Sequence, residues 1–162
     1  MIPAPDKPLE PGDRLGPYKI VRNLGRGAYG AVYEVNRGTL GSRAVLKVLL
    51  SKWSDDAHIV ERFTREALAL RDLHHKNIVD VRELGKIDAN HFIEMEYLEG
   101  ESLKARLART PILAVPDALE ILLPVVSAVD VIHRHRYRMV HRDLKPDNIY
   151  LVTESDGTIV PK

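Results

Sequence analysis

A glycine-rich turn near the start of the chain has the composition of a phosphate-binding loop. Residues 24–32 read LGRGAYGAV and follow the pattern G-x-G-x-x-G-x-V. Glycines let backbone amides come close to phosphate oxygens, because no Cβ stands in the way. The same glycines could instead serve a tight hairpin with positive φ. In a dinucleotide-binding fold the third glycine opens a helix, whereas Gly30 precedes the β-branched run AVYEV. A loop between two strands that covers nucleotide phosphates therefore fits better.

One lysine and one glutamate fall where apolar side chains are expected. Lys47 projects from the run AVLKVL, whose alternating faces are both apolar, so its ammonium needs a partner. Glu66 follows Phe63 by three residues and precedes Leu70 by four, which places a carboxylate on the apolar stripe of a helix. Each could reach solvent instead, the lysine from an edge strand. Opposite charges in neighbouring elements nevertheless explain each other, and such a pair can position the lysine on nucleotide phosphates.

A third cluster, VHRDLKPDNI at residues 140–149, sets six polar or charged residues and a proline between apolar runs. With it the chain resembles the protein kinase family, whose catalytic loop reads H-R-D-x-x-x-x-N. The glycine loop, Lys47 and Glu66 fall in the family's order, and the resemblance runs from about Tyr18 to the last residue. The style is most similar to bacterial Ser/Thr protein kinases. The resemblance implies an ATP-dependent protein kinase that uses ATP and Mg²⁺ and acts on a protein substrate with a Ser or Thr hydroxyl.

The resemblance assigns a role to three residues of this loop. Asp143 would accept the proton of the substrate hydroxyl, and Asn148 would bind one Mg²⁺. Lys145, the residue typical of Ser/Thr kinases, would neutralise charge on the transferring phosphate. Phosphoryl transfer needs positioning and charge neutralisation more than covalent chemistry, and each residue does one of these two jobs.

The resemblance also implies an ATP-binding set. Residues 92–100, FIEMEYLEG, are similar to the strand and hinge between kinase lobes, so Met95 is the implied gatekeeper. The backbone of Glu96 and Leu98 would then hydrogen-bond adenine, between apolar walls. The implied residues are Leu24, Gly25, Arg26, Gly27, Ala28, Tyr29, Gly30, Val32, Val45, Lys47, Glu66, Met95, Glu96 and Leu98.

The elements that position these residues change character along the chain. Residue patterns predict strands at 18–24, 31–35, 43–50, 78–84 and 91–97, and a helix at 57–73. Helices are predicted at 102–109 and 116–136, and Asp156-Gly157 marks a hairpin between 148–152 and 158–160. We expect an α+β, protein-kinase-like two-lobe fold, with a complete N-lobe of five antiparallel strands and one helix, and the first part of a helical C-lobe.

The expected organisation has three parts: a Pro-rich leader at 1–16, the N-lobe at 17–97, and the hinge with a partial C-lobe at 98–162. The chain ends where the family continues into D-F-G, so we expect a domain truncated before that second magnesium-binding element. Exposed apolar surface under the helix at 116–136, and weak or absent transfer, are then expected. The alternative is a non-catalytic ATP-binding or regulatory module, similar to a pseudokinase. A small-molecule kinase is disfavoured by Lys145-Pro146-Asp147.

Composition limits the remaining classes. The net charge is +1 and the chain has no cysteine, which argues against nucleic acid as a partner and against disulfides or thiolate metal sites. No signal peptide or membrane segment is apparent, so we expect a cytoplasmic protein, of unknown oligomeric state. His74 and His75 lack partners at metal spacing, and no zinc site is proposed. Tyr137 and Arg138 stand where the family usually has a glycine.

Overall fold

The residues of the chain gather into two compact units. The computed structural model describes residues 8–39, 41–136 and 140–162. One unit lies within residues 1–72 and 80–97, and the other within 73–79 and 98–162. The short segment 73–79 joins the second unit, where the buried Asn77 donates a hydrogen bond from Nδ2 to the Pro161 carbonyl at 2.7 Å. The departure at Tyr137 and Arg138 lies outside the described residues.

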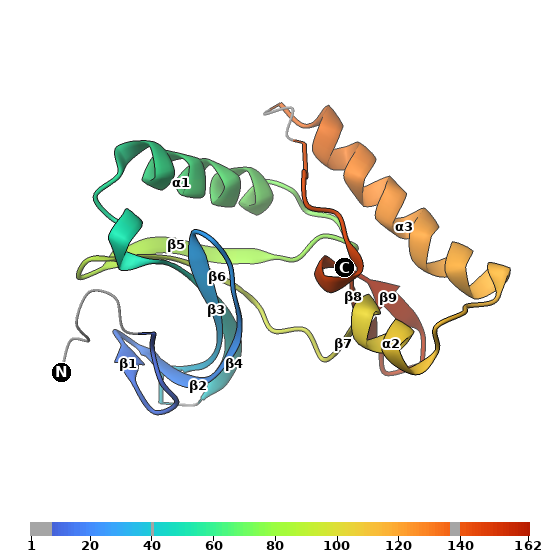
Figure 1. Ribbon diagram of the computed structural model, residues 1–162, viewed down its shortest axis with the longest axis horizontal. Helices are drawn as coiled ribbons and strands as arrows, with labels where there is room; N and C mark the ends of the chain where they lie inside the picture. Colours follow the sequence, from blue (N-terminus) through green and yellow to red (C-terminus); the bar gives the residue numbers. More distant parts are fainter. Residues whose placement is uncertain (1–7, 40, 137–139) are drawn as a thin grey trace. The chain divides into compact units, whose positions relative to one another are not determined.

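The first unit is built on a six-stranded antiparallel sheet with the order β1-β2-β3-β4-β6-β5 (Figure 1). Its strands are β1 Arg14–Leu15, β2 Tyr18–Arg26, β3 Gly30–Arg37, β4 Ser42–Leu49, β5 Val81–Ile87 and β6 Asn90–Glu96. The sheet has one strand more than the five expected. The additional strand is β1, which lies inside the segment expected as a leader and pairs with Tyr18 and Lys19. A two-residue strand is too short to show a period of two. Leu9 and Leu15 are buried as well, so the packed core starts before Tyr18.

Alternating residues of the strands supply two separate apolar clusters. Ala44, Leu46 and Val48 of β4 are buried in one cluster together with residues of β2 and β3. Leu49 belongs to the other, which lies against helix α1, Ala57–Arg71. Asp56 caps α1 by accepting hydrogen bonds from the backbone N–H groups of residues 58 and 59, as the aspartates before the helix predict. The period of two in the strands therefore decides which residues meet the helix.

The buried carboxylate of Glu94 connects strand β6 to strand β2. Glu94 on β6 is 1% exposed and accepts a hydrogen bond from the Tyr18 hydroxyl of β2 at 2.6 Å. Arg37 donates to Glu94 at 2.8 Å and to Glu83 at 2.9 Å. Strands β2 and β6 are separated by β3 and β4 in the sheet, so this contact requires the sheet to curl strongly. Burial, and then the hydrogen bond to Glu94, raise the pKa of the Tyr18 hydroxyl above its ordinary value.

Among its described residues, the second unit combines a small sheet with three helical segments. Its elements are β7 Gly100–Ser102, α2 Leu103–Arg109, α3 Val115–Arg134, η2 Pro146–Asn148, β8 Tyr150–Thr153 and β9 Ile159–Pro161. Strands β7, β8 and β9 form a three-stranded antiparallel sheet, in which Gly157 (φ +85°) turns β8 into β9 as expected. Ser102 caps α2 with its side chain, and Pro116 lies in the first turn of α3.

Helix α3 has one buried face and one exposed apolar face. Ile121, Val125 and Ile132 are buried, and the first two pack with α2 and β8. The exposed large apolar residues on and before the helix are Ile112, Val115, Leu119, Leu122, Leu123 and Val126. Their spacing of three and four residues places those on the helix along one stripe. No described helix is long and apolar enough to cross a membrane.

Removing the Tyr18 hydroxyl tests the curled sheet. In Tyr18→Phe the buried Glu94 loses one donor, and we expect the free energy of unfolding to fall by about 1–3 kcal/mol. Urea unfolding followed by circular dichroism measures it. The matched control is Tyr29→Phe, at a tyrosine that is 46% exposed, where we expect a change within about 0.5 kcal/mol. Equal effects of the two substitutions would show that the Tyr18–Glu94 contact adds nothing.

Charge on the exposed face of α3 should reduce self-association. In the double variant Leu123→Glu, Val126→Glu we expect less binding of a hydrophobic dye and a higher soluble yield, because both side chains already face solvent. The free energy of unfolding should change by less than about 0.5 kcal/mol. In Ile121→Glu, on the buried face, it should fall strongly instead. Size-exclusion chromatography and urea unfolding check both expectations, and a destabilised double variant would contradict them.

Candidate functional site

The glycine loop joins β2 to β3 and leaves open space beside Gly25. The Gly27 N–H donates to the Gly30 carbonyl at 2.8 Å, which closes the turn. A Cβ added at Gly25 would meet nothing within 4 Å, whereas one at Gly30 would lie 2.9 Å from the Val48 carbonyl oxygen. None of these three glycines has a positive φ, so a strained hairpin does not explain them. The open side of the loop fits the close approach of a ligand, which a Cβ would obstruct.

The ion pair expected between Lys47 and Glu66 is present. Lys47 Nζ lies 2.9 Å from Glu66 Oε1, and it also lies 5.8 Å from the centre of the Phe63 ring. The lysine comes from β4 and the glutamate from α1, one on each of the two packed elements. The two side chains are 31% and 42% exposed, so the expected burial of the lysine is only partial. An ammonium held in this position, with solvent access on one side, can also meet a second anion.

Three apolar candidates share the sheet face of Lys47. Val32 lies opposite Lys47 in the β3–β4 pairing, and Met95 lies opposite Val45 in the β4–β6 pairing. Directly paired residues point to the same face, and so do Val45 and Lys47, two residues apart. The first unit thus brings together the candidate adenine walls and the candidate phosphate lysine.

The remaining adenine candidates divide between the two units. The backbone N–H of Glu96 donates to the Asp80 carbonyl at 3.0 Å, so a backbone contact from Glu96 to adenine would use its carbonyl. Leu98 is the first residue of the longer segment of the second unit.

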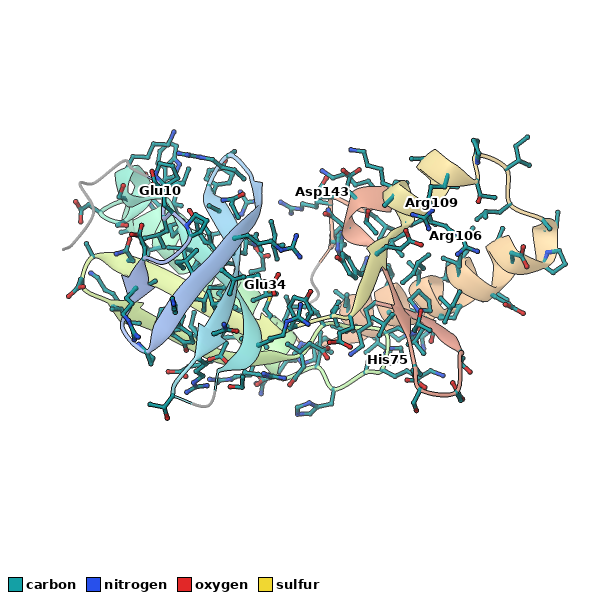
Figure 2. The ribbon with its side chains drawn as sticks, turned by 90° about the horizontal axis from the view of Figure 1, so that it is seen from below. Glu10, Glu34, His75, Arg106, Arg109 and Asp143 are labelled. Atoms are coloured by element: carbon teal, nitrogen blue, oxygen red, sulfur yellow. The ribbon has the colours of Figure 1, made fainter. Side chains whose placement is uncertain are left out.

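Asp143 is the centre of the candidate catalytic loop in the second unit (Figure 2). Lys145 Nζ donates to Asp143 Oδ1 at 2.9 Å, and Asn148 Nδ2 donates to Oδ2 at 2.9 Å and to the backbone carbonyl of Asp143 at 2.8 Å. The three catalytic candidates therefore meet in one place. First the hydrogen bond from Lys145, then that from Asn148, lower the pKa of the Asp143 carboxyl. At neutral pH this carboxylate is ionised and can accept a proton.

The donor atoms of this loop suit a hard cation. Because the Asn148 amide nitrogen bonds to Asp143, the amide oxygen points to the other side, where it can act as a ligand. Amide and carboxylate oxygens are the ligands that Mg²⁺ prefers. In the part of the chain that the structure describes, no three His, Cys, Asp or Glu side chains gather as a metal site. The loop therefore fits Mg²⁺ through Asn148 only where further oxygen ligands come from elsewhere.

The loop is attached to the rest of its unit at its C-terminal end. Ile149 is buried, and its carbonyl accepts a hydrogen bond from the Leu103 N–H at 2.8 Å. Lys104 forms an ion pair with Asp147 at 2.6 Å, a contact that 43 residues of separation hid from sequence reasoning. Arg142 has φ +61°, a conformation that costs free energy for any residue except glycine and is common at functional sites.

A comparison with known families identifies the family of the chain. The family model of the protein kinase domain matches residues 18–160, and the chain belongs to the protein kinase family. It is 38% identical over 143 residues to the probable serine/threonine-protein kinase PknB of Lactococcus lactis, and 37% identical over 141 residues to the serine/threonine-protein kinase PrkC of Bacillus subtilis. These matches cover 88% and 86% of this chain and 22% of each relative.

A solved structure shows the same fold. The kinase domain of PknI from Mycobacterium tuberculosis superimposes with a TM-score of 0.74 at 31% identity, over 95% of this chain and 61% of the PknI chain. The expected similarity to bacterial Ser/Thr protein kinases, and the kinase-like fold with a curled antiparallel sheet, are confirmed. The chain spans less than a quarter of the length of these two curated relatives and about three fifths of that solved kinase domain.

The contacts of Asp143 predict a shift in its titration. In Lys145→Met the carboxylate loses the ammonium that favours its charged form, so the pKa of Asp143 should rise towards the ordinary aspartate value. A pH titration of the side-chain carboxyl carbon by NMR measures it. The control is Lys104→Met, which removes the cation beside Asp147 and should raise the pKa of Asp147 while leaving that of Asp143 unchanged. Equal shifts of Asp143 in both variants would contradict a specific Lys145 contact.

Proposed function

We propose that this chain binds ATP with Mg²⁺ and that its loop at Asp143 transfers a phosphoryl group to a Ser or Thr hydroxyl of a protein. The observation that carries the proposal is the Asp143 carboxylate, held ionised by contacts with Lys145 and Asn148. Membership of the protein kinase family supports it. A location in the cytoplasm, where ATP is available, is part of the proposal.

Each residue would do one physical task. Bound ATP supplies the phosphoryl group, and Mg²⁺ supplies positive charge beside it. Asp143 orients the substrate hydroxyl and takes its proton on a carboxylate oxygen. Lys145 offers an ammonium beside that carboxylate, and Lys47 offers one on the first unit. Glu66 prevents Lys47 from swinging into solvent, and the open glycine loop lets backbone amides approach phosphate oxygens.

For the 162 residues by themselves we expect firm nucleotide binding and slow transfer. The candidates for nucleotide binding lie mostly in the first unit, on packed strands and a helix. The candidates for transfer are exposed, and Asn148 is the one metal ligand that we assign. Positioning contributes most of the catalysis in phosphoryl transfer, so an exposed and sparsely held set should be slow.

Two variants distinguish binding of Mg-ATP from transfer of the phosphoryl group. Thermal unfolding of the full chain is followed with increasing Mg-ATP, and transfer of labelled phosphate to a general acceptor protein is measured in parallel. In Lys47→Met the dissociation constant for Mg-ATP should rise about tenfold, because one charge-assisted contact to phosphate is lost. The control Lys19→Met, at an exposed lysine on β2, should leave it unchanged.

The variant Asp143→Asn keeps the shape of the side chain but cannot take the proton. We expect it to bind Mg-ATP as the original chain does and to lose the measurable transfer. Stabilisation by Mg-ATP without any transfer by the original chain would favour the non-catalytic ATP-binding module instead. Absence of stabilisation at millimolar Mg-ATP would overturn the proposal.

A further inference from the structure

The single tryptophan of the chain contacts the tip of the glycine loop. Trp53 is the last residue of the short 3₁₀ helix η1, Ser51–Trp53, which connects β4 to α1. Its indole N–H donates to the Ala28 carbonyl at 3.0 Å, and its ring lies 5.9 Å from the Tyr29 ring, centre to centre. All of these residues belong to the first unit. Trp53 thus joins the loop to the connection that leads into α1.

Tyr29 is held by two further contacts. Its backbone carbonyl accepts a hydrogen bond from the Leu50 N–H at 2.9 Å. The Arg62 guanidinium of α1 lies 5.6 Å from the centre of the Tyr29 ring, within the range of a cation–π interaction. The loop tip is therefore in contact with the end of β4, with η1 and with α1.

These contacts determine which way the loop amides point. A trans peptide unit is planar, so its carbonyl and its N–H point in opposite directions, and the described chain has no cis peptide. The carbonyls of Ala28 and Tyr29 point at Trp53 and Leu50 respectively. The N–H groups of Tyr29 and Gly30, which belong to the same two peptide units, therefore point away from these partners. Amides that face away from η1 and from the end of β4 can meet a phosphate.

Trp53 is well anchored for this purpose. Its ring packs against the cluster under α1 that contains Leu49 and Phe63. Leu49 lies on β4, the strand that carries Lys47, and Phe63 lies on α1, the helix that carries Glu66. The elements that hold the ion pair therefore also hold the loop tip through one side chain.

We infer that Trp53 is a positioning residue of the glycine loop, which fixes the loop amides for the phosphates of a nucleotide. The inference rests on the proposed nucleotide site, and it adds a specific consequence. Loss of the indole N–H weakens binding of ligands that carry phosphates, and it leaves binding of the base and sugar unchanged. A residue that only packs in the core would affect both kinds of ligand equally.

The test compares the full chain with Trp53→Phe, which keeps an aromatic ring and removes the N–H donor. Dissociation constants for Mg-ATP and for adenosine are measured by calorimetry. We expect the constant for Mg-ATP to rise about threefold or more, as loss of one hydrogen bond predicts, and that for adenosine to stay the same. Equal weakening of both ligands, or no change in either, overturns the inference.

A second measurement needs no nucleotide. Hydrogen exchange of a peptide covering residues 24–31 reports the order of the loop, and we expect faster exchange in Trp53→Phe than in the original chain. If the original chain binds neither ligand, the proposed nucleotide site fails, while the exchange rates still decide whether Trp53 orders the loop. Unchanged exchange overturns the positioning role whether or not nucleotide binds.

A matched pair of arginines on α1 controls for charge. Arg62→Ala removes the guanidinium over Tyr29, whereas Arg65→Ala removes an exposed arginine one turn along the same helix. Since Trp53 is the only tryptophan, its quenching by acrylamide reports the cover that Tyr29 provides. Quenching should increase in Arg62→Ala and in Tyr29→Ala, and it should stay the same in Arg65→Ala. Equal quenching in all three variants means that Tyr29 does not cover the indole, and the inference fails.

Discussion

Strand β4 packs against apolar clusters on both faces of a curled sheet, and this constraint determines which of its positions can carry a charged side chain. Its residues Ala44, Leu46 and Val48 are buried in the cluster shared with β2 and β3. Lys47 and Leu49 therefore point to the face that α1 covers. An ammonium beside an apolar cluster needs a carboxylate, and α1 supplies Glu66. The pair forms only when the period of two in the strand and the period of 3.6 in the helix are in phase.

The sequence predicted the features that rest on strong local patterns. Lys47 and Glu66 interrupt clear apolar periods, so each residue drew attention by itself and their pairing followed. The Tyr18–Glu94 contact has no such signal, because 76 residues and two intervening strands separate its partners. A tyrosine at the start of a strand and a glutamate in one both look ordinary. Trp53 was missed for a related reason, since its partner is the backbone carbonyl of Ala28, which any residue type possesses.

The buried carboxylates of Glu34 and Glu94 make the strand register depend on charge as well as on apolar residues. Glu34, labelled on the sheet in Figure 2, is held by Arg22 of β2 at 2.7 Å and by Arg43 of β4 at 3.0 Å. Burial opposes its ionisation, but the hydrogen bonds from Arg43 and Arg22 lower its pKa overall. A slip of one residue would turn Glu34 to the other face and leave a buried charge unpaired, which costs several kcal/mol by a rough estimate. The same register sets Val32 opposite Lys47.

The candidate catalytic loop is held by weaker means than the sheet. Asp143, Lys145 and Asn148 are all exposed, and ion pairs between exposed groups contribute little and are screened by salt. The loop is anchored where Ile149 enters the core and where its carbonyl meets Leu103. A cation arriving at Asp143 therefore competes with contacts of small net strength, whereas an anion arriving at Lys47 meets an ion pair that packed elements hold. Of the two candidate sites, the one at Lys47 is therefore the more firmly held, and the loop at Asp143 is the part whose order a bound ligand can still increase.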